Sequence, residues 1–285
     1  MQQTNRSRHR HITSFQVISL GFLSAILLGS LLLMLPIATK SGQCTSFLDA
    51  LFTATSAVCV TGLVVNDTAT YWSLFGQGVI LLLIQIGGMG IITIAIAIAV
   101  VSGRKIGLMQ RSTMQEAISA PTVGGIVRRT QFIIRTTILI EIIGAVLLAP
   151  VFCRDFGFWK GIWYSLFHSI SAFCNAGFDL IGIRTPFSSL TSYSVQPIVN
   201  LVIMMLIIAG GIGFLTWEDI KNRKWHFKKY RMQSKVILMV TGILIFLPAL
   251  YFFILNFQMC LLQKEYGFLC FNPLRREQQD SIRQI

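Results

Sequence analysis

The chain has 285 residues, of which 54% are hydrophobic and only 12% are charged. Ordinary soluble domains carry about 25% charged residues, so this composition excludes a typical soluble or disordered protein. The formal net charge of +13 lies in blocks beside long apolar segments, which favours a membrane protein over a nucleic-acid-binding one.

Five apolar blocks are long enough to cross a bilayer, whose hydrocarbon core of about 30 Å requires about 20 helical residues. We therefore expect an all-α integral membrane protein. Lys and Arg are concentrated before the first block, between the second and third, and between the fourth and fifth. The remaining loops mix both signs, which predicts a cytoplasmic N-terminus and places those loops outside. The blocks lie near residues 15–35, 72–101, 131–152, 195–217 and 235–257.

Two segments, 55–63 and 170–178, share the pattern Ser-Ala-x-Cys-x-x-Gly followed by Leu or Phe. Each follows a Gly-to-Pro segment and precedes a Gly-Gly-x-Gly segment, in the same order. Two unrelated turns would not reproduce all of these features, so we interpret the pattern as an internal duplication. Each copy is predicted to be a re-entrant pore loop, in which a short helix leads into an extended stretch that ends at Gly62 or Gly177.

The duplication divides the chain into consecutive units of outer helix, pore loop and inner helix, two complete and a third begun. Pro36 and Pro150 are expected to end the two outer helices, and Ser46 with Asp49 resembles a capping box opening the first pore helix. In chain order we predict a cytoplasmic basic tail (1–13), repeat 1 (14–101, loop 46–63), a cytoplasmic connector (102–129), repeat 2 (130–217, loop 158–178), a basic cytoplasmic loop (218–233), the first helix of repeat 3 (234–257) and an aberrant tail (258–285).

Such loops are suited to conducting a cation. A cation that loses its water shell needs replacement oxygens, and the backbone carbonyls of an extended loop supply them at a fixed spacing. The glycines fit because rows of carbonyls require backbone angles that a Cβ disfavours. Asp67 and Asp179 are expected at the outer mouth, where carboxylates would concentrate cations. The predicted filter carbonyls belong to Cys59, Val60, Thr61 and Gly62 in one wall and to Cys174, Asn175, Ala176 and Gly177 in the other.

Glycines near the middle of both predicted inner helices leave two interpretations open. In lipid, small residues permit close helix packing, whereas in a pore they provide a hinge or clear the wall. The candidate hinge glycines are Gly87, Gly88 and Gly90 in the first inner helix and Gly210, Gly211 and Gly213 in the second.

Two titratable side chains fall on predicted membrane-embedded helices. Glu141 is costly in a bilayer, and a hydrogen bond between packed helices is favoured over a role in the ion path. His168 is interpreted as a packed pore-helix histidine, because no second metal ligand is near it in sequence. The sequence shows no acid–base pair or nucleophile constellation, so an enzyme is disfavoured, and no Cys/His spacing resembles a zinc site.

The last segment departs from the repeat pattern. Between Pro273 and Ile282, codons read one base earlier permit Ser-Val-Thr-Ala-Arg-Thr-Ala-Gly-Phe-Asn, which resembles the loop around Gly177. We therefore expect a shifted reading frame after about Gln258, a truncated chain, and no third pore loop in residues 258–285. The nucleotide sequence tests this expectation.

In its loops and its Gly-Gly-x-Gly inner helices the chain resembles the Trk/Ktr/HKT superfamily of potassium transporters, and most closely the bacterial Ktr-type membrane subunit. The resemblance covers about residues 15–257. It implies four pore-loop units around one pore in the bacterial plasma membrane, with K⁺ as the transported ion and Na⁺ as a candidate coupling ion. It also implies a homodimer seated on a cytoplasmic ring of nucleotide-binding regulatory subunits.

The sequence has no glycine-rich phosphate motif, so nucleotide would bind the regulatory partner, and neither an organic cofactor nor nucleic acid is expected on this chain. The predicted function is potassium uptake through a selectivity filter of backbone carbonyls. The alternative is a non-conducting truncated fragment of such a transporter, or a structural membrane subunit. Because two loops provide half of a four-loop cage, we expect the chain alone to conduct poorly or not at all.

Overall fold

The computed structural model describes residues 13–90, 93, 115, 126–182, 186–223, 226–251 and 253–254. Among these residues the regular structure is helical, apart from an isolated antiparallel bridge between Thr39 and Trp72. In the described part of the chain, three helices are long and apolar enough to cross a membrane, and the number rises to four if two helices separated by a short break are counted as one span. The expected all-α membrane protein is confirmed. The three are Phe15–Met34, Val127–Phe156 and Met232–Tyr251, and the broken pair is Pro197–Gly211 with Phe214–Arg223.

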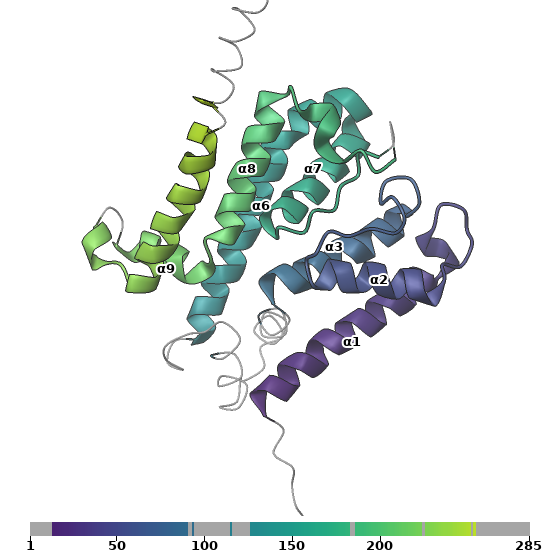
Figure 1. The fold of residues 1–285 in the computed structure, drawn as a ribbon. Coiled ribbons are helices and arrows are strands. Elements are labelled where there is room, and N and C mark those ends of the chain that lie inside the picture. The colour runs from purple at the N-terminus through teal and green to yellow at the C-terminus, as the bar shows by residue number, and fades with distance from the viewer. Residues whose placement is uncertain are drawn as a thin grey trace, which may run out of the picture. The chain divides into compact units, whose positions relative to one another are not determined.

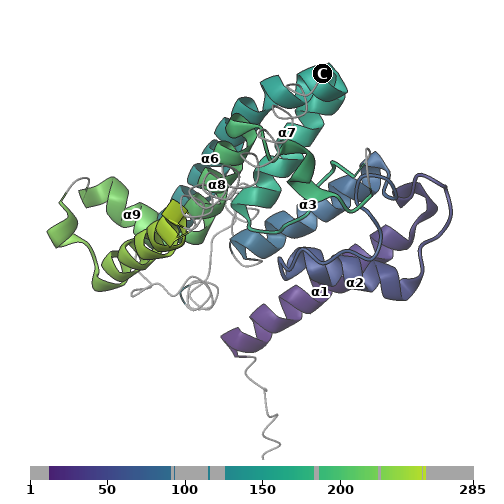
Figure 2. The same cartoon turned by 45° about the horizontal axis from the view of Figure 1, so that its top comes forward.

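The chain forms two compact units, Met1–Leu215 and Thr216–Ile285. Within the first unit, α1, α2 and α3 pack on one another, α6, α7 and α8 form a second group, and α3 also contacts α7 (Figures 1 and 2). Short 3₁₀ turns follow α1 and precede α8. The bounds are α1 (Ser14–Met34), η1 (Pro36–Ala38), α2 (Phe47–Val58), α3 (Leu74–Met89), α6 (Ile126–Phe156), α7 (Phe158–Phe173), η2 (Ser189–Tyr193) and α8 (Pro197–Gly211).

Local sequence signals set the start of three helices in the first group. Thr13 and Gln16 form a capping box at α1, since the Thr13 hydroxyl accepts from the Gln16 N–H while the Gln16 side chain accepts from the Thr13 N–H. The Ser46 hydroxyl accepts from the Asp49 N–H at 3.2 Å and caps α2, which is one of the two hydrogen bonds of the predicted capping box. Ser73 caps α3 in the same way. Each cap satisfies a helix-end N–H that has no partner within the helix.

Proline ends one outer helix but not the other. α1 stops before Pro36, as predicted, whereas α6 runs through Pro150 to Phe156, so the predicted end at Pro150 is wrong. A proline removes one backbone hydrogen bond, and tertiary packing can outweigh that loss. Here Phe152 is fully buried, and Gly161 of α7 lies so close to the backbone of Phe152 and Cys153 that a Cβ would overlap it.

The outer helices α1 and α6 each have an exposed apolar face and a face that packs on the interior. Leu28 of α1 is 62% exposed and Val146 of α6 is 64% exposed, as suits side chains that contact lipid acyl chains. Trp72, Ile80 and Phe167 are fully buried where α3 meets α2 and α7, which correspond to the two predicted pore helices. The packed interior of the first unit therefore lies against α2 and α7, the helices that precede the two loops.

Glycines bring α3 and α8 against the ends of the pore helices. A Cβ on Gly87 would overlap the carbonyl oxygen of Val58, and a Cβ on Gly210 would overlap the carbonyl oxygen of Phe173. Gly90, at φ +82°, caps α3, and Gly213, at φ +83°, separates α8 from α9 (Phe214–Arg223). The glycine segments therefore end α3 and α8, whereas a continuous inner helix was expected at these positions.

The second unit contains most of α9, the turn η3 (Phe227–Lys229) and the helix Met232–Tyr251. Asp219 is 1% exposed and accepts hydrogen bonds from the Ser234 hydroxyl at 2.7 Å and the Arg231 N–H at 3.1 Å. The Arg231 guanidinium also pairs with Glu218 at 2.9 Å. The basic loop predicted at 218–233 is thus partly organised by its two acidic residues. Most of the 102–129 connector and all of the 258–285 tail lie outside the described residues.

The close approach of Gly87 generates a stability prediction. Gly87→Ala should destabilise the protein by about 1–3 kcal/mol, because the added methyl must displace the Val58 carbonyl. Gly78, on the same helix, has no atom within 4 Å of the place that a Cβ would take, so Gly78→Ala should be neutral or stabilising by about 0.5–1 kcal/mol. Thermal unfolding of the purified protein in detergent measures both effects. Equal behaviour of the two variants would contradict the packing argument.

Candidate functional site

The segments after α2 and α7 adopt the same unusual backbone conformation. Val60 and Asn175 have φ of +56° and +58°, and Gly62 and Gly177 have φ of +75° and +72°. Positive φ is uncommon in residues other than glycine and persists only where surrounding contacts hold it. The four positions correspond in the two sequence copies, so the copies share a backbone path as well as a pattern.

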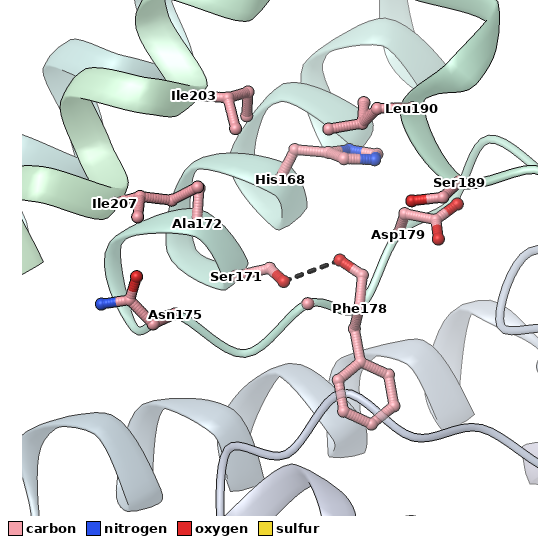
Figure 3. A pocket seen from close by; sticks show the side chains of 11 residues that line it. His168, Ser171, Ala172, Asn175, Phe178, Asp179, Ser189, Leu190, Ile203 and Ile207 are labelled. Atoms are coloured by element: carbon pink, nitrogen blue, oxygen red, sulfur yellow. Dashed lines mark hydrogen bonds between the residues drawn. The ribbon is translucent and has the colours of Figure 1, made fainter. Parts of the chain in front are cut away.

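Hydrogen bonds fold each loop back on its own helix. The Thr61 N–H donates to the Ser56 carbonyl at 2.9 Å, and the Ala176 N–H donates to the Ser171 carbonyl at 2.8 Å. The serine hydroxyls add a second contact: Ser56 accepts from the Thr61 hydroxyl at 2.9 Å, and Ser171 donates to the Phe178 carbonyl at 2.7 Å (Figure 3). The serines of the shared motif therefore position the extended stretches.

The carbonyls of these stretches are left without protein donors. In the described part of the chain, no hydrogen bond is donated to the carbonyls of residues 59–62 or 174–177. Of these residues only Ala176 is buried, and Cys59, Thr61, Asn175 and Gly177 are exposed, so most of this carbonyl row is accessible to a group from outside the described residues. Figure 3 shows the second loop passing in front of its pore helix, with a pocket of about 200 Å³ beside it.

The two loops meet at their glycines. A Cβ on Gly62 would lie 2.6 Å from the carbonyl oxygen of Ala176 and 3.2 Å from the Cα of Gly177. A Cβ on Gly177 would lie 3.4 Å from the Cα of Gly62. The structure thus brings together the two predicted filter segments, which lie 115 residues apart in the chain, and only glycine allows this approach.

His168 packs behind the second loop. It is 2% exposed, its Nδ1 lies 2.7 Å from the Tyr164 carbonyl, and its Nε2 accepts from the Leu180 N–H at 3.3 Å. Because Nε2 accepts, Nδ1 carries the proton and donates to Tyr164, which makes the ring neutral. His168 is a packed histidine, as the sequence predicted, and it holds the segment that follows Gly177 through the Leu180 N–H.

Glu141 forms the hydrogen bond between helices that was expected of it. The side chain is 4% exposed, and the Gln85 amide of α3 donates to its two carboxylate oxygens at 2.9 and 3.1 Å. The Gln85 carbonyl in turn lies 3.8 Å from the Cys174 thiol at the start of the second filter stretch. This polar chain connects the second outer helix, the first inner helix and the second loop.

Sequence reasoning missed the partners on α3. Gln85 and Gln77 are polar residues in an apolar block, which is the only signal that could have revealed them. Gln77 accepts from the Trp163 indole N–H at 2.9 Å, a contact between residues 86 positions apart. Periodicity gives no information about such long-range pairs.

The two acidic residues predicted at the mouth have different surroundings. Asp67 is 8% exposed, and its oxygens accept from Thr70 and from the Phe187 N–H. Asp179 is partly exposed and accepts from the Ile181 N–H at 3.0 Å. Burial raises the pKa of the Asp179 carboxyl above its ordinary value, and the Ile181 hydrogen bond partly offsets this rise. Attraction of cations by either residue stays a prediction.

The candidate hinge glycines pack closely, but not uniformly. Gly88 lies against Cys174, so a Cβ there would overlap the cysteine side chain, whereas a Cβ on Gly211, at the matching place in the second repeat, would meet no atom within 4 Å. Close packing is therefore observed at Gly87, Gly88 and Gly210. Hinge motion at the inner-helix glycines stays a prediction.

Comparison with known protein families identifies the family to which this chain belongs. Residues 2–263 match the TrkH family, described as cation transport protein. The chain belongs to the TrkH family. Its members are membrane transporters and not enzymes, so the chain is a multi-pass membrane protein of a cation transport family.

Individual relatives agree with this membership. Over 237 residues the chain is 43% identical to the potassium/sodium uptake protein NtpJ of Enterococcus hirae, covering 83% of this chain and 51% of the relative. It is 45% identical over 243 residues to the Ktr system potassium uptake protein B of Bacillus subtilis, covering 85% and 53%, and 35% identical to that of Vibrio alginolyticus, covering 85% and 52%. The chain therefore spans about half the length of these relatives.

The Gln85–Glu141 contact yields a second prediction. Gln85→Leu should destabilise the protein by about 1–3 kcal/mol, because it leaves a buried carboxylate without its donor. Adding Glu141→Leu should recover part of this loss, since both polar groups are then removed together. Thermal unfolding of the two single variants and the double variant in detergent checks the coupling. A double variant whose loss equals the sum of the single losses would contradict it.

Proposed function

We propose that the chain contributes two walls of a selectivity filter in a potassium uptake pore of the plasma membrane. The observation that carries the proposal is the pair of adjoining loops whose carbonyls accept no hydrogen bond from the described residues. The printed names of the relatives, which refer to potassium or potassium/sodium uptake, support K⁺ as the transported ion and Na⁺ as a second or coupling ion.

The geometry suggests how a cation would be held. The carbonyls of residues 59–62 and 174–177 replace water around a dehydrated ion, while their N–H groups hold the loops to the pore helices. α2 and α7 end at Val58 and Phe173, directly before the loops, so the partly negative helix ends favour a cation there. Asp67 and Asp179 lie beyond the filter stretches, where carboxylates would attract cations to the mouth.

Two loops leave part of a cation's surroundings open. A dehydrated ion shared among carbonyls from four sides requires four loops, and the described residues contain two. Water entering the open sides would keep the ion hydrated, and lipid there would leave carbonyls unpaired at a cost of several kcal/mol per group. We therefore infer poor conduction by this chain alone. The alternative is that it is a non-conducting fragment or a structural membrane subunit.

The partners follow from the relatives named as Ktr system proteins, which supports a membrane subunit of a system with several components. We propose a homodimer in the lipid bilayer, a ring of nucleotide-binding regulatory subunits on the cytoplasmic side, and basic inner loops as the surface that the ring contacts. The excess of Lys and Arg in the inner loops supports a cytoplasmic N-terminus and outward-facing pore loops.

Growth of a potassium-uptake-deficient bacterium at low K⁺ tests the transport proposal. The 285-residue chain should not restore growth, whereas residues 1–250 joined to the C-terminal half of the Bacillus subtilis relative should do so. In that fusion, Gly62→Ser should lower the preference for K⁺ over Na⁺ by about tenfold, because it disturbs the carbonyl row.

Gly42→Ser is the matched control, because Gly42 also has a positive φ, of +70°, but a Cβ there would meet no atom within 4 Å. It should leave the ion preference unchanged. Selective rubidium uptake by the chain alone in liposomes would overturn the inference of poor conduction. A fusion that inserts in the membrane but transports no K⁺ would overturn the transport proposal.

Thiol labelling tests the proposed orientation. Cys44 is exposed between α1 and α2, so a membrane-impermeant maleimide should label it in intact cells, and Cys44→Ser should lower that signal to what the exposed Cys59 contributes. A cysteine placed at the exposed Asn222, on α9, should react only after the membrane is permeabilised. The reverse pattern would contradict the orientation drawn from the charges.

A further inference from the structure

Asp67 joins the two repeats beyond their filter loops. It lies five residues after Gly62, and the corresponding residue of the second repeat, five after Gly177, is Gly182. These matched positions touch, since a Cβ on Gly182 would overlap the Asp67 carboxylate. The repeats therefore differ at a position where they meet, with a carboxylate on one side and a residue without a side chain on the other.

Both oxygens of the Asp67 carboxylate accept hydrogen bonds in this contact. One oxygen accepts from the Thr70 N–H at 2.8 Å and the Thr70 hydroxyl at 2.9 Å, within its own loop. The other accepts from the Phe187 N–H at 2.9 Å, across 120 residues of chain. A buried carboxylate is tolerated only with such donors, and Asp67 is 8% exposed. Its side chain thus fixes the first outer loop against the outer loop that follows α7.

We propose that Asp67 is a positioning residue that sets the spacing between the two filter loops, with Gly182 and the Phe187 N–H as its partners in the second repeat. The inference rests on the proposed filter. It gives a role in positioning that filter to a residue that lies outside the carbonyl rows. The loops touch at Gly62 and Gly177, and Cys174, at the start of the second loop, packs against Gly88 and Gln85 of α3. Asp67 adds a contact between the repeats that lies after the two glycines in the chain, and this contact further restricts how one loop can move relative to the other.

A carboxylate that mainly attracted cations would have different surroundings. Its oxygens would face solvent and would not be occupied by three donors. Asp179 is the more exposed of the two acidic residues, and its described hydrogen bond, to the Ile181 N–H, stays within its own loop. Asp179 is therefore the matched control for Asp67, with the same chemistry close to the second filter but without a bond to the first repeat.

A double-mutant cycle on the purified chain in detergent tests the contact. Gly182→Ala should lower the midpoint of thermal unfolding, because its methyl group meets the Asp67 carboxylate. In the Asp67→Ala background, Gly182→Ala should lower the midpoint by less than about half of the amount seen in the wild-type background, because the carboxylate that its methyl group would meet is gone. Equal losses in the two backgrounds would overturn the proposed contact.

Hydrogen–deuterium exchange on the same samples tests the positioning role. Asp67→Ala should speed amide exchange in both filter loops, 59–63 and 174–178, by about tenfold, the effect of losing one buried hydrogen bond. Asp67→Asn, which keeps one acceptor oxygen, should have a smaller effect in the same two loops. Asp179→Ala should speed exchange only in the second loop.

Faster exchange confined to residues 64–70 after Asp67→Ala would make Asp67 a local cap and overturn the proposal. Neither experiment measures transport, so the two hypotheses can fail separately. If the unfolding cycle and the exchange pattern hold while the fusion protein transports no K⁺, the proposed transport is wrong and the loop contact is retained. If K⁺ uptake is found without these couplings, the positioning role is wrong.

Discussion

Backbone carbonyls without donors are the constraint on which the rest of this structure depends. A polar group that faces hydrocarbon costs several kcal/mol, so irregular backbone at membrane depth is tolerated only where protein or water surrounds it. After α2 and α7, the N–H groups of residues 59–61 and 174–176 donate to the preceding helices, and the carbonyls of residues 59–62 and 174–177 accept no hydrogen bond from the described residues. The helices packed beside each loop partly enclose it, since Val60, Gly62 and Cys174 are half-buried and Ala176 is buried.

Close packing by small residues makes this enclosure possible. Gly87 and Gly210 let α3 and α8 reach the carbonyl ends of the two pore helices, and Gly161 lets α7 lie against the last turns of α6. The pore helices are thereby held between an outer and an inner helix. In lipid there is no hydrophobic gain from helix association, so such contacts and interhelical hydrogen bonds supply the attraction.

Polar side chains join the two repeats at different levels. Gln85 binds Glu141 near Cys174, Gln77 binds Trp163 on α7, and Asp67 binds the Phe187 N–H beyond the two proposed filter stretches. Each is a repeat-specific feature on a duplicated framework. A buried polar pair of this kind costs more when broken than it contributes when formed, so it favours one relative placement of the repeats over others.

The sequence alone determined the membrane class, the helical content and the two matching loops with their glycines, because hydropathy and internal duplication are local or directly comparable signals. The roles of Ser46 and Pro36 were also predicted correctly, since caps and missing N–H groups act within one turn of helix. The end of α6 was predicted wrongly, because packing around Phe152 stabilises the helix beyond Pro150. The contact between Gly62 and Gly177, the partners of Gln85 and the burial of Asp67 were decided only by tertiary structure. Each joins residues far apart in the chain, and one-dimensional pattern does not encode which distant side chains meet when the helices pack.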